Sequence, residues 1–319
     1  MLELARTKKQ TKLKKHDGLL KEISTNKILF LMLVPAFVYF IIFKYLPMVG
    51  VILAFKKYTY AGGIFGSPWC GFDNFRFLFI SGIIYRITRN TVLYNLSFLT
   101  LGIILQVFCA VILSELSSKV FKKVTQSFMF LPYFVSFVLL SAFVYNVFNY
   151  EYGTMNSIIQ SMGGEPVDIY SMPWVWKYIL NVFYQWKNIG YGTVIFLAAI
   201  TSISSEYYEA ARIDGANIFQ QIRLITIPLI VPTIVIVFLF NVGKILQGQF
   251  ELFYQIVGNN GQLYEATDII DTYVFRSLTR DFDIGMGTAV GFYQSLFGLL
   301  LILTVNYVVK KVQSEYALF

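Results

Sequence analysis

The chain has 319 residues, of which 56% are hydrophobic and 14% are charged, with a mean hydropathy of +0.61 and a net charge of +8. Soluble domains carry about 25% charged residues, so this composition excludes an ordinary soluble enzyme and indicates a membrane protein. Much of the positive charge lies in residues 1–27. A basic run before a first apolar helix is typical of a cytoplasmic flank facing anionic lipid, and less often of a nucleic-acid-binding arm.

Six apolar segments follow this basic tail. A helix needs about 20 apolar residues to cross the hydrocarbon core of a bilayer. We therefore expect an all-α membrane protein with one six-helix transmembrane domain over residues 28–311 and a short C-terminal tail, 312–319. The expected spans are Ile28–Phe43 with a continuation to Phe55, Thr91–Ser114, Val124–Tyr150, Asn188–Ser205 with an earlier start near Tyr178, Leu224–Gly243 and Ile284–Val309.

An even number of spans places both termini on one side, and the positive-inside rule makes that side the cytoplasm. One loop disagrees, because residues 44–90 hold six basic residues and one acid yet are placed outside. Within this loop, GFDNFRFLF at 71–79 predicts a short helix lying at the interface. Small residues in the last span predict close helix contacts; they are Gly285, Gly287, Ala289, Gly291 and Gly298.

No pattern of catalytic or metal-binding residues stands out. Cys70 lies in a loop and Cys109 in an apolar helix, and neither has ligand-type spacing, so neither a disulfide nor a metal site is implied. The single histidine, His16, lies in the basic tail. A Gly-rich phosphate loop of the GxxxxGK[ST] kind is missing from the sequence, so the chain is not expected to hydrolyse ATP. We expect a non-enzymatic chain.

A polar, charged stretch at 204–228 separates the fourth and fifth expected spans. Ser204 and Glu206 predict the start of a helix, and Gly215 predicts its break. A second short helix is expected over Ile218–Ile225, before Pro228 opens the next span. Two short helices lying along the membrane face suit a lever that a partner protein pushes, so we interpret the stretch as a docking element.

The spacing within this stretch resembles the EAA loop of ABC-transporter permeases. That motif reads EAA, three residues, Gly, nine residues, then Ile-x-Leu-Pro. Here EAA at 209–211 is followed by Gly215 and, nine residues later, by ITIP at 225–228, so only the Leu differs. The string YEAARIDGA resembles the carbohydrate-uptake (maltose-type) branch of importers. By this resemblance, the ATPase-docking residues are Tyr208, Glu209, Ala210, Ala211, Asp214 and Gly215.

The resemblance extends over nearly the whole chain. The segments FIIFKYLPMVGVILAFKKY, GSPWCGFDNFRFLF, WKNIGYGTVIFLAAI and VNYVVKK are similar to permeases of the polysaccharide and complex-oligosaccharide subgroup of Gram-positive bacteria. The family implies a type I importer fold in the cell membrane and transport by alternating access. It also implies four kinds of partner: a second homologous permease, two ATPase subunits that bind ATP and Mg, a lipid-anchored extracellular binding protein, and an oligosaccharide.

Two stretches near membrane depth combine aromatic faces with hydrogen-bonding side chains, which is the make-up of a sugar site. In maltose-type permeases the corresponding parts of these spans line the sugar path. The expected path residues are Gln185, Lys187, Asn188, Tyr191, Asn241, Lys244, Gln247 and Gln249. The alternative is that these polar groups simply bond to other helices. Two lysines beside the path lead to the hypothesis of an anionic oligosaccharide, unless Glu251 or a partner's carboxylate neutralises Lys244.

Three functions are therefore weighed. The first is the permease subunit of an ATP-driven oligosaccharide importer, with no cofactor of its own. The second is an ABC permease for a solute other than a sugar. The third, an ion-driven secondary transporter, is disfavoured because such proteins usually carry carboxylates at the membrane midplane, whereas the charge-free cores of the six expected spans contain no Asp or Glu.

Overall fold

A computed structural model describes residues 26–312. The basic tail, including His16, and the C-terminal tail from residue 313 lie outside this range, so the predictions made for them are not addressed. Within it, regular structure is helical apart from one isolated antiparallel bridge between Lys56 and Trp69. The chain forms two compact units, residues 1–52 and 53–319, which are described separately.

The first unit contains one long apolar helical stretch. It begins as α2 (Lys27–Phe40), passes through the π-turn η1 (Ile41–Tyr45) and continues as η2 (Leu46–Phe55), whose last residues belong to the second unit. All its large hydrophobic side chains from Ile28 to Val34 except Phe30 are strongly exposed. This is the surface expected of a helix surrounded by lipid.

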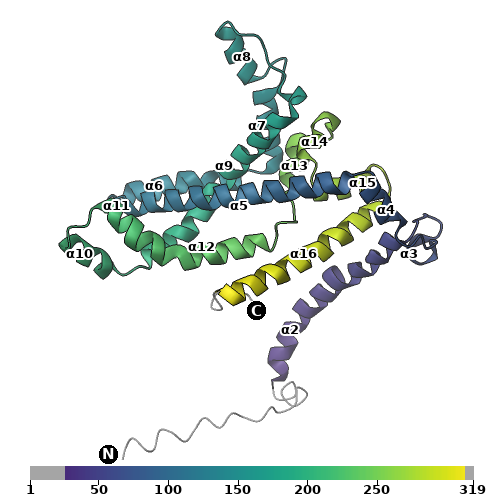
Figure 1. Cartoon of the computed structure of the whole chain (residues 1–319), viewed down its shortest axis with the longest axis horizontal. Helices are drawn as coiled ribbons and strands as arrows, with labels where there is room; N and C mark the ends of the chain where they lie inside the picture. The colour runs from purple at the N-terminus through teal and green to yellow at the C-terminus, as the bar shows by residue number, and fades with distance from the viewer. Residues whose placement is uncertain (1–25, 313–319) are drawn as a thin grey trace, which may run out of the picture. The chain divides into compact units, whose positions relative to one another are not determined.

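The second unit holds the remaining helices (Figure 1). The long ones are α5 (Ile83–Glu115), α9 (Pro173–Thr201), α12 (Ile227–Val242) and α16 (Ile284–Val312). The shorter ones are α3 (Gly63–Gly66), α4 (Asp73–Ile80), α6 (Lys119–Phe130), η3 (Leu131–Phe134), α7 (Phe137–Phe148), α8 (Thr154–Ser161), η4 (Ile169–Ser171), α10 (Ser205–Ile213), α11 (Ile218–Gln221), η5 (Ile222–Thr226), α13 (Phe250–Val257), η6 (Gly261–Leu263), α14 (Tyr264–Thr267) and α15 (Ile270–Thr279).

Four helical stretches are long and apolar enough to cross a membrane, and up to six if two bent pairs are each counted as one span. The single stretches are 27–55, 83–115, 218–242 and 284–311. One bent pair, 119–134 with 137–148, turns by 91° at a break over residues 135–136. The 3-10 turn η3 just before the break contains Pro132, which cannot donate a backbone hydrogen bond and so disfavours a continuous α-helix. The other pair joins α9 to α10 at 67°.

The helix α5 packs along α9 through aromatic and polar contacts. The rings of Phe98 and Tyr184 stack with their centres 3.9 Å apart. Nearby, the Ser97 hydroxyl donates to the side-chain oxygen of Asn181 at 2.7 Å. In Figure 1, α10 and α11 lie at one end of α5, and α15 lies at the other. The docking stretch and the segment containing α13–α15 therefore occupy opposite ends of this helix.

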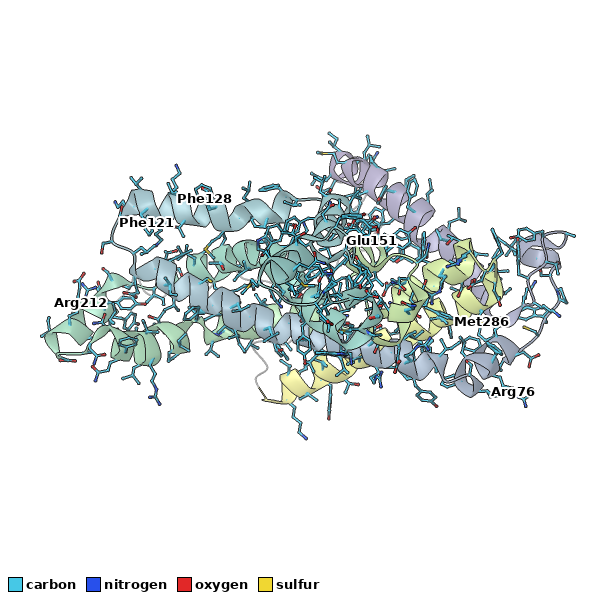
Figure 2. All side chains as sticks on the ribbon, turned by 90° about the horizontal axis from the view of Figure 1, so that it is seen from above. Arg76, Phe121, Phe128, Glu151, Arg212 and Met286 are labelled. Atoms are coloured by element: carbon cyan, nitrogen blue, oxygen red, sulfur yellow. The ribbon has the colours of Figure 1, made fainter. Side chains whose placement is uncertain are left out.

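Close helix packing depends on glycine at Gly190 of α9. A Cβ built there would lie 2.0 Å from the carbonyl oxygen of Met129 on α6, which is far inside contact distance. Elsewhere on α6, Phe121 and Phe128 (labelled in Figure 2) are exposed, with exposed fractions of 58% and 70%. One face of α6 thus packs closely against α9, and another face is exposed, as expected of a surface that contacts lipid.

Several sequence predictions can be compared with this fold. A helix forms where GFDNFRFLF predicted one, as α4, and its place at a membrane interface stays a prediction. The second short helix of the docking stretch is not separate, because α11, η5 and α12 run on without a break from Ile218 to Val242. In the last span, Gly285 and Gly287 face close neighbours as predicted, whereas a Cβ at Gly291 or Gly298 would meet nothing within 4 Å.

Candidate functional site

The docking stretch folds as a well-capped unit at one end of the helix bundle. The Ser204 hydroxyl accepts the Glu206 N–H at 3.3 Å, which caps α10, and Gly215 turns the chain with a φ of +77°. Asn217 and Gln220 then form a reciprocal capping box at the start of α11. Local hydrogen bonds thus fix both ends of the turn that joins α10 to α11.

The predicted docking residues divide into two faces of α10. Glu209 and Ala210 are exposed, as are Asp214 and Gly215 just after the helix, whereas Tyr208 and Ala211 are half-buried. Arg212 projects from the same helix (Figure 2). The half-buried positions 208 and 211 are three residues apart, as expected of side chains on one helix face. The exposed face is therefore available to a partner, and the other is turned toward the protein.

Tyr208 connects α10 to the helix that follows. Its hydroxyl lies 2.9 Å from Oγ1 of Thr226, which is 1% exposed and closes the π-turn η5 at the base of α12. The next residue but one, Pro228, cannot donate a backbone hydrogen bond, which is consistent with an irregular turn at this point. The docking helix is thus tied directly to the start of α12.

The other end of α12 leads into residues 243–249, a non-helical segment that we call the strap. The Asn95 amide of α5 donates to the strap carbonyls of Ile245 and Gln247 at 3.0 and 3.1 Å. Non-helical backbone at membrane depth is tolerated only where protein buries it or where it lines a cavity. These hydrogen bonds satisfy two carbonyls that a helix would otherwise have paired.

Two further helices hold the strap from its other side. The Asp271 carboxylate of α15 accepts the Gly248 N–H at 2.6 Å, and the Gln294 amide of α16 donates to the Leu246 carbonyl at 2.7 Å. The same Gln294 amide reaches Asp271 at 3.2 Å. Burial raises the pKa of Asp271 above its ordinary value, although the hydrogen bonds from Gly248 and Gln294 oppose the shift. Side chains from α5, α15 and α16 therefore fix the strap.

A cavity of about 140 Å³ opens between the strap and the contact of α5 with α9. It brings together all four path residues predicted near the end of the fifth span. The exposed Lys244 ammonium lies 4.2 Å from the centre of the Phe240 ring. The cavity is lined by Asn95, Phe98, Leu99, Tyr184, Asn241, Lys244, Gln247, Gly248 and Gln249.

The path residues predicted on α9 do not line this cavity. Gln185 donates to the Phe98 carbonyl at 3.0 Å, and Asn188 donates to the carbonyl of Tyr184 in its own helix at 2.8 Å. The exposed Tyr191 stacks on Tyr133 with ring centres 4.9 Å apart. These contacts agree with the alternative that buried polar groups serve helix packing, and a place in the substrate path stays a prediction for these residues.

Lys187 of α9 is held at the break of the bent helix. Its ammonium donates to the Tyr133 carbonyl at 2.7 Å and to the Val135 carbonyl, and it lies 5.0 Å from the centre of the Phe137 ring. The side chain is buried, with 8% of its surface exposed. The carbonyls that the break at residues 135–136 leaves free therefore receive a cation, and such a partner is what an intramembrane lysine requires.

The predicted path residues do not include five that line the cavity: Asn95, Phe98 and Leu99 of α5, Tyr184 of α9 and Gly248 of the strap. The three on α5 lie in the second span, which was interpreted as plain apolar helix. Asn95 was the available signal, because a polar amide within an apolar span normally bonds to something. Phe98 carried no signal, since one more aromatic residue in a chain with 31 Phe is indistinguishable from lipid-facing surface.

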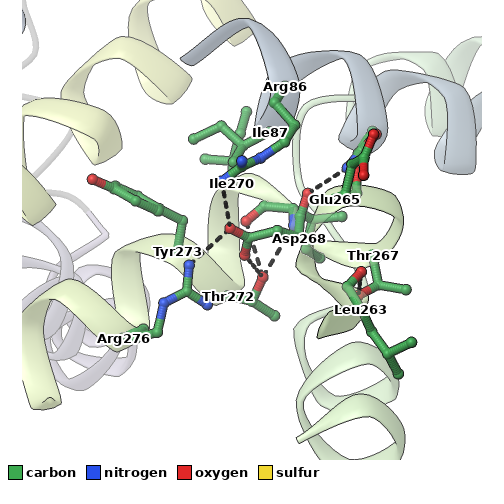
Figure 3. A network of polar contacts seen from close by, with 12 residues as sticks. Arg86, Ile87, Leu263, Glu265, Thr267, Asp268, Ile270, Thr272, Tyr273 and Arg276 are labelled. Atoms are coloured by element: carbon green, nitrogen blue, oxygen red, sulfur yellow. Dashed lines mark hydrogen bonds and ion pairs between the residues drawn. The ribbon is translucent and has the colours of Figure 1, made fainter. Parts of the chain in front are cut away.

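A buried ionic network anchors the segment around α14 and α15 to α5. The Asp268 carboxylate, with no exposed surface, accepts Arg276 at 2.7 Å and lies 3.8 Å from Arg86 (Figure 3). Thr272 donates to its other oxygen at 3.0 Å, and Asn90 of α5 donates to its backbone carbonyl at the same distance. The carboxylate's charge raises the pKa of Arg276, although burial alone would lower it. The network holds α15, and with it Asp271, in place beside the strap.

Known proteins resemble the chain over most of its length. A family model described as "binding-protein-dependent transport system inner membrane component" matches residues 99–314. Protein LplB of Bacillus subtilis is 34% identical over 92% of both chains. The polygalacturonan/rhamnogalacturonan transport system permease protein YteP of Bacillus subtilis is 33% identical over 95% of this chain and 94% of its own.

Solved structures agree with these relatives. A chain of a bacterial ABC transporter involved in the import of the acidic polysaccharide alginate superposes with a TM-score of 0.83, at 31% identity, covering 92% of this chain and 99% of that one. A second structure, of the alginate transporter in complex with an alginate pentasaccharide-bound periplasmic protein, gives a TM-score of 0.82 at the same identity.

Proposed function

The chain belongs to the family of binding-protein-dependent transport system inner membrane components, and from this premise we propose that it is a permease subunit of an ATP-driven oligosaccharide importer. The observation that carries the proposal is similarity to a polygalacturonan/rhamnogalacturonan permease over 95% of the chain and to an alginate importer chain over 92% of it. The family model alone would not specify a sugar.

The exposed face of α10 is the proposed contact with the ATPase. Glu209 and Ala210 lie on the surface of a helix whose ends are fixed by Ser204 and Gly215. A small alanine surface beside a carboxylate suits insertion into a cleft with a basic rim. That separate subunit would bind ATP and Mg, and α10 of this chain would transmit its movement to the membrane helices.

The strap cavity is the proposed part of the sugar path. Its volume of about 140 Å³ is below the range of about 300–1,000 Å³ that encloses a small ligand. The chain therefore supplies one wall, and the second, homologous permease supplies the rest. Aromatic surface from Phe98 and Tyr184 faces amide groups of the strap, a combination that suits a sugar ring with one apolar side.

The proposed orientation places the docking stretch and both termini in the cytoplasm. The segment containing α13–α15 then faces outside, where a binding protein would deliver the oligosaccharide. The opposite placement of α10 and α15 along α5 supports this assignment (Figure 1). The basic residues of loop 44–90 count against an outside position by the positive-inside rule. Two of them have partners within the protein, because buried Lys56 donates to two loop carbonyls and Arg86 faces Asp268. This weakens the objection to the proposed orientation.

A charge reversal on α10 tests the proposal. The tagged chain is purified in mild detergent from the bacterium that encodes it, and co-purifying subunits are identified by mass spectrometry and by ATP hydrolysis. We expect a second permease and an ATPase with the wild type, loss of the ATPase with Glu209→Lys, and its retention with Glu165→Lys, an exposed acid between α8 and η4, away from α10.

Two outcomes would contradict the proposal. One is a wild-type chain that is folded in detergent yet purifies without any ATPase. The other is a Glu209→Lys variant that keeps both the ATPase and normal transport, which would remove the assigned contact.

A further inference from the structure

Two lysines were predicted beside the sugar path, and the structure places their ammonium groups in different environments. Lys187 is buried and Lys244 is exposed. A cation that recognises a ligand must keep donors free, whereas a cation that stabilises the fold uses its donors on the protein. The two lysines can therefore be distinguished by their partners.

Lys187 has its partners within the protein. Its ammonium donates to the carbonyls of Tyr133 and Val135 and lies over the rings of Tyr133 and Phe137. Moving this group to a ligand would leave two carbonyls without a hydrogen-bond donor at the break of the bent helix, which is unfavourable for buried polar groups. Lys187 is accordingly unsuited to charge recognition.

Lys244 keeps its donors free. Lys244 lines the strap cavity, and within the described residues the interaction recorded for its ammonium is with the Phe240 ring, 4.2 Å from the ring centre. Within residues 26–312, the Lys244 ammonium makes no ion pair or hydrogen bond, and Glu251 lies within 4 Å of neither lysine. An unpaired cation on a cavity wall at membrane depth needs an anion from elsewhere.

The rest of the cavity suits a sugar acid. No carboxylate is among the lining residues that the structure describes. In that part of the chain the side-chain amides of Gln247 and Gln249 also form no hydrogen bond to the protein. The nearest acid on the strap's other side, Asp271, is already bonded to Gly248 and Gln294. The cavity thus offers one free cation, two free amides and the apolar faces of Phe98 and Tyr184.

We propose that Lys244 binds the carboxylate of a uronic-acid residue in the transported oligosaccharide, and that Lys187 takes no part in recognising this charge. The inference rests on the proposed function and names its substrate class. The name of the relative YteP includes polygalacturonan and rhamnogalacturonan, and a similar solved structure belongs to a transporter involved in the import of alginate, an acidic polysaccharide. Those statements concern other proteins, but their cargoes have the chemistry that this cavity fits.

The test compares two probes that differ only in charge. Oligogalacturonide of fixed length and its methyl ester are titrated into the complete detergent-purified transporter, and binding is followed by calorimetry. The ester keeps the sugar ring and removes the carboxylate charge. The variants are Lys244→Met, Lys244→Arg and, as the matched control, Lys187→Met.

We expect the wild type to bind oligogalacturonide at least about tenfold more tightly than the ester, as removal of a charge-assisted hydrogen bond predicts. Lys244→Met should bind both probes equally, and Lys244→Arg should restore the preference. Lys187→Met should leave the ratio of the two affinities unchanged, even where it lowers the amount of folded protein.

Three results would overturn the inference: a wild type that binds both probes equally, one that binds neither, or a Lys244→Met variant that keeps the charge preference. Retention of the ATPase in the same preparations shows whether the proposed function still holds. Failure of the charge preference with the ATPase present removes the substrate class alone.

Discussion

The hydroxyl of Tyr208 lies 2.9 Å from Oγ1 of Thr226, and this contact joins the docking helix α10 to the base of α12. Sequence reasoning assigned Tyr208 to the ATPase contact, and that assignment stays a prediction; in the chain alone its side chain is half-buried. Because α12 ends at the strap, the proposed mechanism would carry a movement of α10 to the cavity through this contact and one helix. Under that proposal, Tyr208 is a positioning residue between the ATPase contact and the sugar path.

Removal of this hydroxyl should weaken coupling without releasing the ATPase. We expect Tyr208→Phe to keep the complex intact and to lower transport per ATP hydrolysed by several-fold, since the lost hydrogen bond contributes about 1 kcal/mol. Tyr207→Phe is the control, because Tyr207 is 58% exposed on the neighbouring position. Uptake and ATP hydrolysis are measured together in proteoliposomes. An equal number of molecules transported per ATP in Tyr208→Phe and Tyr207→Phe would refute the positioning role of Tyr208.

Lys187→Met should lower stability rather than change selectivity. Two carbonyls at the break between η3 and α7 lose their donor, so the free energy of unfolding should fall by about 2–6 kcal/mol. Lys177→Met, an exposed lysine on the same helix, should have little effect. Thermal unfolding of the purified complex in detergent measures both, and a Lys187→Met variant as stable as the wild type would contradict the account.

The two arginines of the Asp268 network should differ in their contribution. Arg276→Gln breaks a 2.7 Å ion pair with a carboxylate that has no exposed surface, and such losses cost about 3–5 kcal/mol. Arg86→Gln removes a longer contact of 3.8 Å from a side chain that is 39% exposed, so its cost should be smaller. The midpoints of denaturant unfolding rank the two, and the reverse order would be inconsistent with the network.

Asp271 should give the fold a dependence on mildly acidic pH. Its pKa is raised by burial, so the folded protein binds this proton more tightly than the unfolded chain does. Stability from this group is therefore absent at neutral pH and grows as the pH falls through the raised pKa toward the ordinary value of 3.8. The advantage of Asp271→Asn over the wild type should be largest at neutral pH and shrink on acidification.

The melting temperatures of the two proteins, compared across pH, check this prediction. Asp281→Asn is the control, because Asp281 is exposed near the same segment. Its difference from the wild type should not follow the same pH profile. An advantage of Asp271→Asn that stays constant or grows on acidification would contradict the raised pKa.

Much of the docking stretch could be predicted from sequence, because its signals are local. A cap at Ser204 and a left-handed turn at Gly215 depend on residues within a few positions of each other, and both are present. The predicted end of the second short helix, at Ile225, was wrong. Continuation of α11 into α12 depends on a π-turn at 222–226, which no local rule indicates.

The side-chain partners of the path residues could not be predicted, because they come from distant segments. Lys187 and Lys244 look alike in sequence, each a cation in or beside an apolar span. Their difference arises because the break at residues 135–136, some fifty residues away in sequence, offers free carbonyls to Lys187, whereas the strap carbonyls near Lys244 accept from Asn95 and Gln294. Asn95 was missed for the same reason, since its partners lie on the strap.

Transport by this chain is proposed to be powered by ATP hydrolysis in a separate subunit that acts through α10, and one measurement tests this most directly. The complex is reconstituted in proteoliposomes with its binding protein, and oligosaccharide accumulation is followed with and without ATP and Mg on the α10 side. The account predicts accumulation that requires ATP and is lost in Glu209→Lys. Accumulation driven by an ion gradient without ATP, and retained in Glu209→Lys, would contradict it.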